Sequence, residues 1–121
     1  MEDKPTLVLG ATDRPEKYAF RAIQMLLERN FTVHAIGNRK GKILEVDIIT
    51  APILIPNIHT ITLYLNAERQ KEYYKYLISL TPKRIIFNPG TENLELKRLA
   101  ENAGIKTENA CTLVMLRLNS Y

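Results

Sequence analysis

The segment between residues 6 and 36 alternates short apolar runs with one amphipathic stretch, and this pattern strongly constrains the fold. Residues 6–9 are an apolar run that ends at Gly10, which predicts a buried strand followed by a turn. Apolar residues then recur at spacings of three and four between residues 19 and 27, as on the buried face of a helix. Residues 31–36 alternate and run apolar up to Gly37. A strand, a helix and a strand within about thirty residues are typical of a βαβ unit.

The remainder of the chain continues this alternation of strand and helix patterns. Strand patterns occur at residues 60–65, 84–87 and 105–108, and helix patterns at residues 68–80, 93–103 and 112–118. In the second of these helices the predicted inward residues are Leu96, Leu99, Ala100 and Ala103. Residues 42–49 are assigned either a short strand or a turn. We therefore predict a single domain over residues 1–121. Its fold class is α/β, a Rossmann-like, doubly wound parallel sheet of about five strands with helices on both faces.

The charge of the chain suits a phosphorylated ligand. The formal net charge is +4 and the sequence pI is about 9.3, a balance that favours phosphate groups or nucleic acid. Apart from the group at residues 39–42, the basic residues are scattered. Neither an aromatic RNA-binding signature nor zinc-ligand spacing accompanies them. We therefore expect a small-molecule nucleotide ligand and no nucleic-acid partner.

The single cysteine and the spread of apolar residues bear on the compartment. Cys111 is the only cysteine, which excludes an internal disulfide and suits a reducing compartment. No apolar stretch approaches the roughly 20 residues that span a bilayer, since prolines and polar residues interrupt residues 48–58. The first residues show no signal-peptide pattern. We expect a cytoplasmic protein without membrane contact.

Four predicted strands end in residues that suit ligand binding. In an open sheet of this kind, ligands bind beyond the carboxyl ends of the strands, where the strand order reverses. If the fold is as predicted, these strand ends converge on one rim. The residues that we expect to bind a ligand there are Gly10, Ala11, Thr12, Arg14, Asn38, Arg39, Lys40, Asn66, Asn88, Pro89 and Gly90.

The turn after the second predicted strand bears on which nucleotide is bound. The dinucleotide fingerprint G-x-G-x-x-G is absent, because Thr12 and Pro15 occupy two of its glycine positions. A typical NAD-binding protein places an acidic residue after the second strand, whereas this chain has Asn38, Arg39 and Lys40. Basic side chains at this place suit a phosphate on the adenosine ribose, as in NADP or coenzyme A. The alternative interpretation is a solvated basic turn.

Catalytic patterns are sparse. His34 lies within an apolar strand pattern and His59 precedes another, which favours structural roles for both. Cys111 has no histidine near it in the sequence, and there is no paired carboxylate or metal-ligand cluster. The tyrosines at positions 73, 74 and 76 favour packing or an oligomer face. We therefore expect binding rather than catalysis, with no catalytic residue and no metal site.

Taken together, these segments resemble the family of small stand-alone CoA-binding domains, which are related to the N-terminal domain of the succinyl-CoA synthetase α subunit. The resemblance spans about residues 6–116 and is carried by residues 8–12, Pro15, Glu16, Arg21, 26–28, 33–36, 90–95, 103–105 and Cys111. It implies a Rossmann-like domain that holds coenzyme A along the strand ends. The loop at residues 10–12 would meet phosphate and the turn at residues 38–40 would flank the adenosine portion. Residues 64–66 and 88–90 would line the rest.

The chain also departs from this family at several positions. Family members usually have Asn-Pro-Lys after the second strand and Phe-Arg-Pro after the third, where this chain has residues 37–39 and the uncharged residues 64–66. A serine common in the first helix is Ala19, and a Trp-x-Gln pattern is replaced at residues 86–88.

The resulting expectation is non-catalytic binding of coenzyme A or an acyl-CoA thioester, with any reaction carried out by a partner enzyme that uses acyl-CoA. One alternative is an NADP-dependent reductase or another small nucleotide-using enzyme. The other is a degenerate domain that acts through protein contacts, such as a homodimer formed through the tyrosine-bearing helix. An open, electropositive pocket at the strand ends counts against this last alternative.

Overall fold

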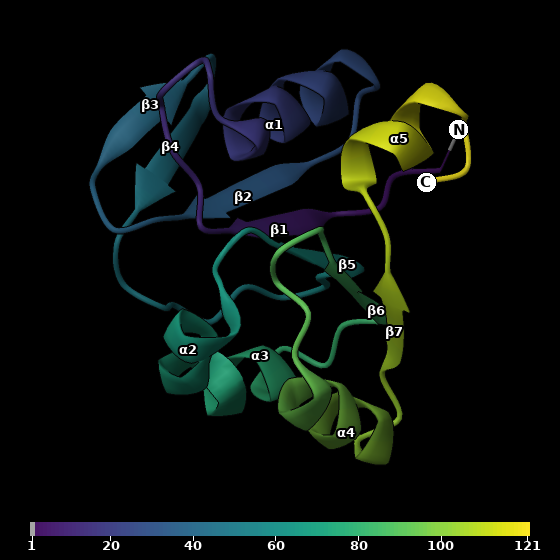
Figure 1. The fold of residues 1–121 in the computed structure, drawn as a ribbon. Coiled ribbons are helices and arrows are strands. Elements are labelled where there is room, and N and C mark those ends of the chain that lie inside the picture. Colours follow the sequence, from purple (N-terminus) through teal and green to yellow (C-terminus); the bar gives the residue numbers. More distant parts are fainter. Residues whose placement is uncertain (1) are drawn as a thin grey trace.

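A computed structural model of the chain describes residues 2–121 and contains a seven-stranded sheet (Figure 1). In spatial order its strands are β3 (Gly41–Ile43), β4 (Val46–Ile49), β2 (Val33–Ile36), β1 (Thr6–Leu9), β5 (Thr60–Leu63), β6 (Arg84–Phe87) and β7 (Lys106–Asn109). All neighbours pair in parallel except β3 and β4. The predicted α/β class and mainly parallel sheet are therefore confirmed. The sheet has seven strands rather than about five.

The extra strands come largely from a hairpin within residues 41–49. Here β3 and β4 pair in antiparallel register, with Ile43 opposite Val46. Leu44 takes a positive φ of 53° at the connecting turn, a conformation that a non-glycine residue adopts infrequently. The hairpin is short and has no glycine at its turn, so it carries little of the sequence signal by which hairpins are usually predicted. For this reason the sequence alone did not distinguish a short strand from a turn at residues 42–49.

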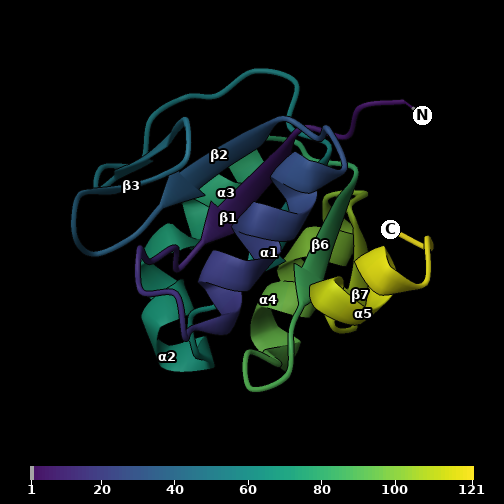
Figure 2. The same cartoon turned by 90° about the horizontal axis from the view of Figure 1, so that it is seen from above.

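Helices cover both faces of the sheet. On one face lie α1 (Tyr18–Glu28) and α5 (Thr112–Arg117), and on the other α2 (Ala67–Gln70), the 3₁₀ segment η1 (Lys71–Tyr73), α3 (Tyr74–Ser79) and α4 (Leu94–Asn102) (Figures 1 and 2). Because successive strand residues face opposite sides, Leu7 and Leu9 pack toward the second group of helices and Val8 toward the first. The strands are apolar on both faces because each face is covered.

Helix α1 forms where the spacing of apolar residues predicts it. Ala19, Ala22, Ile23 and Leu26 are buried against the sheet, and Leu27 is half-buried. Helix α4 has a narrower buried face than predicted. Its buried residues are Leu96 and Ala100, whereas Leu99 is 42% exposed and Ala103 is exposed as well.

The helix predicted at residues 68–80 is divided. It consists of α2, η1 and α3, and Tyr73, with φ −101° and ψ −3°, ends η1 and precedes α3. The tyrosines at positions 73, 74 and 76 are half-buried and pack against the core on this face. None of the helices within residues 2–121 is long and apolar enough to cross a bilayer.

Candidate functional site at the carboxyl ends of the strands

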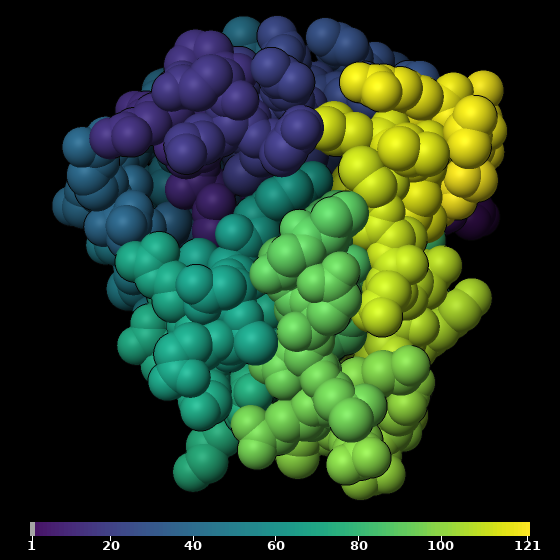
Figure 3. All heavy atoms as spheres, in the orientation of Figure 1, coloured from purple at the N-terminus to yellow at the C-terminus, as the bar shows by residue number. Residues whose placement is uncertain are grey.

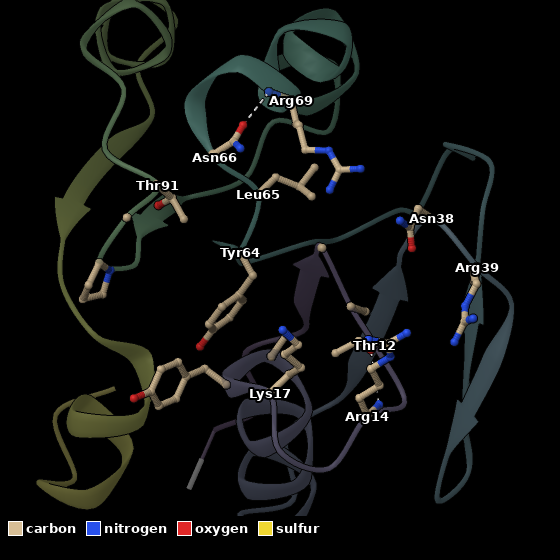
Figure 4. Close-up of a pocket in the computed structure, with 16 residues that line it drawn as sticks. Thr12, Arg14, Lys17, Asn38, Arg39, Tyr64, Leu65, Asn66, Arg69 and Thr91 are labelled. Carbon is tan, nitrogen blue, oxygen red and sulfur yellow. Dashed lines mark hydrogen bonds between the residues drawn. The ribbon is translucent and has the colours of Figure 1, made fainter.

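A cavity of about 680 Å³ lies where the loops after β1, β2, β5 and β6 meet (Figure 4). Its volume falls within the usual range of small-molecule sites. In the space-filling view, the purple N-terminal segment, the teal segment around α2 and the green loop after β6 border a hollow (Figure 3). The lining residues are Gly10, Ala11, Thr12, Arg14, Lys17, Tyr18, Ala19, Asn38, Arg39, Tyr64, Leu65, Asn66, Arg69, Pro89, Gly90 and Thr91.

The fold brings together most of the binding residues expected from the sequence. Those that line the cavity are Gly10, Ala11, Thr12, Arg14, Asn38, Arg39, Asn66, Pro89 and Gly90. They come from four different loops, which supports the prediction that the strand ends share one rim. Two expected residues, Lys40 and Asn88, do not belong to the lining.

Asn88 lies below the cavity and uses its side chain to join secondary-structure elements. Its amide nitrogen donates hydrogen bonds to Thr62 Oγ1 at 2.6 Å and to the Leu63 carbonyl at 2.9 Å. Its side-chain oxygen accepts from the Thr112 amide at 2.8 Å. Only 2% of the residue is exposed. Asn88 therefore connects β5, β6 and the start of α5, and its amide group is already used within the protein.

Gly10 allows the loops after β1 and β5 to pass in contact. Its φ is +96°, and a Cβ atom at this position would lie 2.9 Å from the carbonyl carbon of Tyr64 and 3.1 Å from the amide nitrogen of Leu65. The chain continues from β1 to α1 on one face, and from β5 to α2 on the other. Gly10 thus stands at the reversal of strand order, where doubly wound sheets bind their ligands.

The amide groups of Gly10 and Ala11 are not free to bind a ligand. Both donate to the carbonyl oxygen of Ile36 at 2.9 Å. Free amide groups instead come from the first turn of α1, because the initial N–H groups of a helix have no intrahelical acceptor. Lys17 is the N-cap residue of α1 and provides no side-chain cap, and the first turn contains no acidic residue. By contrast, Asn66 caps α2 and Asn93 caps α4 with side-chain hydrogen bonds.

The charged side chains around the cavity are all basic. They are Arg14, Lys17, Arg39 and Arg69, and no residue of the described lining is acidic. The ion pairs within residues 2–121 join Lys71 to Glu68 and Arg84 to Glu108, so none of the four takes part in one. A concave site with charge of one sign concentrates ligands of the opposite sign. Together with the uncapped start of α1, this charge suits a ligand with several phosphate groups.

Tyr64 contributes a neutral phenol beside the cavity. Its hydroxyl oxygen is buried and has no hydrogen-bond partner among the described residues. Burial, and secondarily the nearby Cys111, raises the pKa of the Tyr64 phenol well above its ordinary value. The hydroxyl therefore stays protonated near neutral pH and does not act as a base, and its buried oxygen lies inside the fold rather than in the cavity.

The histidines and the cysteine lie outside this cavity. Burial lowers the pKa of His34 and of His59, and neither residue lines the site. Cys111 is half-buried at the start of α5 and does not line the site either. Within residues 2–121 no group of three or more His, Cys, Asp or Glu side chains is placed to hold a metal ion.

Several lining residues were not expected as ligand contacts from the sequence. Lys17 is the N-cap of α1 and Tyr18 its first residue, Arg69 lies in α2, and Thr91 follows Pro89 and Gly90. Asn66 gives a signal for Arg69, because an asparagine that precedes a helical segment predicts an N-cap and so the position of the first turn. Tyr18 is 66% exposed and lies outside the buried face of α1.

A second cavity of about 550 Å³ lies beside β2 and β4 and has a different character. Glu45, Asp47 and His34 belong to its lining, which is otherwise mainly apolar and contains no lysine or arginine among the described residues. Carboxylates without balancing basic groups disfavour an anionic ligand. The cavity at the strand ends is therefore the better candidate for a phosphorylated ligand.

The doubly wound sheet and the basic cavity at its reversal point define the class of Rossmann-like nucleotide-binding domains. Within that class, the family model described as CoA binding domain matches residues 4–117, and the chain belongs to this family. The resemblance noted from the sequence is confirmed. No curated protein matches the chain in sequence.

Solved structures extend this likeness. A crystal structure of an uncharacterized protein is 40% identical, with a TM-score of 0.97 and coverage of 100% of both chains. A hypothetical protein from Pyrococcus horikoshii OT3 is 25% identical, with a TM-score of 0.86 over 97% of this chain and 84% of the other. The dinucleotide-forming acetyl-coenzyme A synthetase 1 of Ca. Korarchaeum cryptofilum, in complex with phosphate and ADP, is 15% identical. It has a TM-score of 0.69 over 86% of this chain and 25% of its own, and shares the fold.

Proposed function

We propose that this protein binds coenzyme A, or an acyl-CoA thioester, in the cavity at the strand ends and does not itself transform it. The observation that carries the proposal is a cavity whose charged groups are all basic, at the reversal point of the sheet and beside an uncapped helix. Coenzyme A has a pyrophosphate and a ribose phosphate, and such groups bind to free amide groups at a helix N-terminus and to arginine and lysine. Family membership supports the same ligand class.

The lining residues support a binding role rather than catalysis. Side chains with hydroxyl groups are present, namely Thr12, Tyr18, Tyr64 and Thr91. No histidine, cysteine or carboxylate of the described chain lines the cavity and could activate them. A reaction of the bound thioester would then belong to a partner enzyme. The open, basic cavity also argues against a domain that has lost its ligand site.

Calorimetric titration with coenzyme A, acetyl-CoA, dephospho-coenzyme A, NAD and NADPH tests this proposal, with thermal unfolding measured for each ligand. A ligand that binds only the folded state raises its stability according to saturation. We expect coenzyme A and acetyl-CoA to bind at micromolar concentration and NADPH to bind much more weakly. A preference for NADPH would favour the reductase alternative. The absence of binding by all five ligands at millimolar concentration would overturn the proposal.

A further inference from the structure

Arg69 is a basic residue of the cavity that comes from α2, on the wall away from α1. Its guanidinium group extends from α2 toward the side of the cavity where Asn38 lies (Figure 4). Arg69 and Asn38 line both the main cavity and an adjoining recess of about 50 Å³, and the lining of the recess also includes Glu72. The side chain of Arg69 makes no ion pair or hydrogen bond within the described chain, although its backbone is fixed. A free, exposed guanidinium group therefore faces the ligand space.

The segment that carries Arg69 is held rigidly by its neighbours. The side chain of Asn66 accepts a hydrogen bond from the Arg69 amide at 2.9 Å. Gln70 is fully buried, and its side-chain nitrogen donates to the carbonyl oxygens of Leu65 and Thr91, both at 2.8 Å. Gln70 also accepts from Asn93 at 2.9 Å. Because α2 is fixed to the loops after β5 and β6, little of its backbone has to be ordered when a ligand binds.

The basic residues of the cavity fall into two groups according to the elements that carry them. Arg14 and Lys17 precede α1 and accompany its free amide groups. Arg39 follows β2, and Arg69 extends from α2 toward the side of the cavity where Asn38 lies, whereas the Arg39 side chain runs away from α2 in this view (Figure 4). The turn directly after β5 holds Tyr64, Leu65 and Asn66 and is uncharged. The positive charge of this wall is therefore supplied by Arg69.

We propose that Arg69 is a specificity-determining residue that binds, with Arg39, the ribose phosphate of the ligand. The pyrophosphate would occupy the separate group formed by Arg14, Lys17 and the start of α1. This inference rests on the proposed binding of coenzyme A and assigns the residue that separates coenzyme A from its dephosphorylated form. A phosphate monoester carries nearly two negative charges near neutral pH, and the planar guanidinium group binds phosphate through two hydrogen bonds.

The test compares Arg69→Ala with a matched control, Lys75→Ala, by titration with coenzyme A and dephospho-coenzyme A. Lys75 is exposed on α3 and lines neither the cavity nor the recess. We expect Arg69→Ala to lower the affinity for coenzyme A about tenfold or more, as for the loss of a charge-assisted hydrogen bond. The affinity of this variant for dephospho-coenzyme A should change little. Lys75→Ala should change neither affinity, and Arg69→Lys should retain part of the discrimination.

The double variant Arg39→Ala/Arg69→Ala provides a second measurement, and we expect it to bind the two ligands equally. If Arg69→Ala lowers the affinity for both ligands equally, or lowers neither affinity, the role of Arg69 is overturned while the binding function stays in place. If the unmodified protein binds neither ligand, the proposed function fails as well. Thermal unfolding of each variant without ligand shows that the comparison is made on folded protein.

Discussion

Gly10 is the residue at which backbone conformation and the site are most closely coupled. A side chain there would meet the backbone of Tyr64 at 2.9 Å and would have to adopt a φ of +96°. Gly104 also has a positive φ, of +81°, but a Cβ atom there meets nothing within 4 Å. Substitutions at the two glycines therefore separate the effect of the positive φ on stability from the effect of the steric contact.

We expect Gly10→Ala to lower the free energy of unfolding by about 3 kcal/mol or more, because strain and steric overlap add. Gly104→Ala should lower it by about 1 kcal/mol, from the conformation alone. Denaturant unfolding measures both values. Gly10→Ala should also weaken the binding of coenzyme A, since the loops on both sides of the cavity must move. Equal effects of the two substitutions on stability would contradict this interpretation of Gly10.

Arg39 and Lys40 are neighbours that the structure distinguishes. Both were expected as ligand contacts from the sequence, but only Arg39 belongs to the lining of the cavity. We therefore expect Arg39→Ala to lower the affinity for coenzyme A more than that for dephospho-coenzyme A, so that the ratio of the two affinities changes by about tenfold. Lys40→Ala, the matched control, should change this ratio little, and both affinities are measured by calorimetry. A larger effect of Lys40→Ala would mean that the turn binds its ligand in another conformation.

Among the elements, those with a clear apolar pattern were predictable, including the four-residue strands β1 and β6, and those without one were not. Helix α1 has eleven residues and a regular buried face, so its position followed from spacing alone. The β3–β4 hairpin is too short for such a signal. The 3₁₀ segment between α2 and α3 could not be predicted either, because the helical pattern of residues 68–80 runs through it without a break.

The same distinction applies to the site. Which loops would meet was predictable, because strand ends of a parallel sheet lie at one edge. Which side chains point into the cavity depends on local geometry. Asn88 follows β6, as expected, yet its side chain turns down to Thr62 and Thr112. Arg69 enters the site because Asn66 sets where α2 begins.

Gln70 tests how α2 is fixed to the rest of the site. Replacing it with leucine leaves the carbonyl oxygens of Leu65 and Thr91 without their donor in a buried region. We expect Gln70→Leu to lower the free energy of unfolding by about 1–3 kcal/mol. Gln24→Leu, at an exposed position of α1, should change it by less than about 0.5 kcal/mol. Denaturant unfolding measures both, and similar values for the two variants would show that the contacts of Gln70 add little.

At the scale of the whole molecule, the candidate site and a set of contacts between distant parts of the chain lie at opposite ends of the sheet. The carboxyl ends hold the open cavity with its unpaired basic groups. Near the opposite ends, Arg84 donates from Nε to Thr60 Oγ1 at 2.8 Å and lies over the ring of Tyr121 at 4.4 Å. The Tyr121 hydroxyl is 2.6 Å from Thr6 Oγ1. These contacts connect distant parts of the chain away from the site, so stability and binding can be perturbed separately.

The histidines predict how the stability of the whole fold depends on pH. Burial lowers the pKa of His34, and burial with Arg84, Lys4 and Lys83 lowers that of His59. The unfolded chain therefore takes up protons first as the pH falls through about 6.5. We expect the free energy of unfolding to decrease between about pH 8 and pH 5. The double variant His34→Gln/His59→Gln should show a smaller decrease, and an unchanged slope would mean that other groups control it.

The most direct test of the central claim is a titration of the isotopically labelled protein with coenzyme A, followed by two-dimensional NMR of the backbone amides. We expect the largest shifts at residues 10–20, 38–39, 64–69 and 89–91, which surround the cavity at the strand ends. Residues around the second cavity, such as Val33, Glu45 and Asp47, should shift little. Shifts concentrated at the second cavity, or no shifts at saturating ligand, would contradict the assignment of the strand-end cavity as the coenzyme A site.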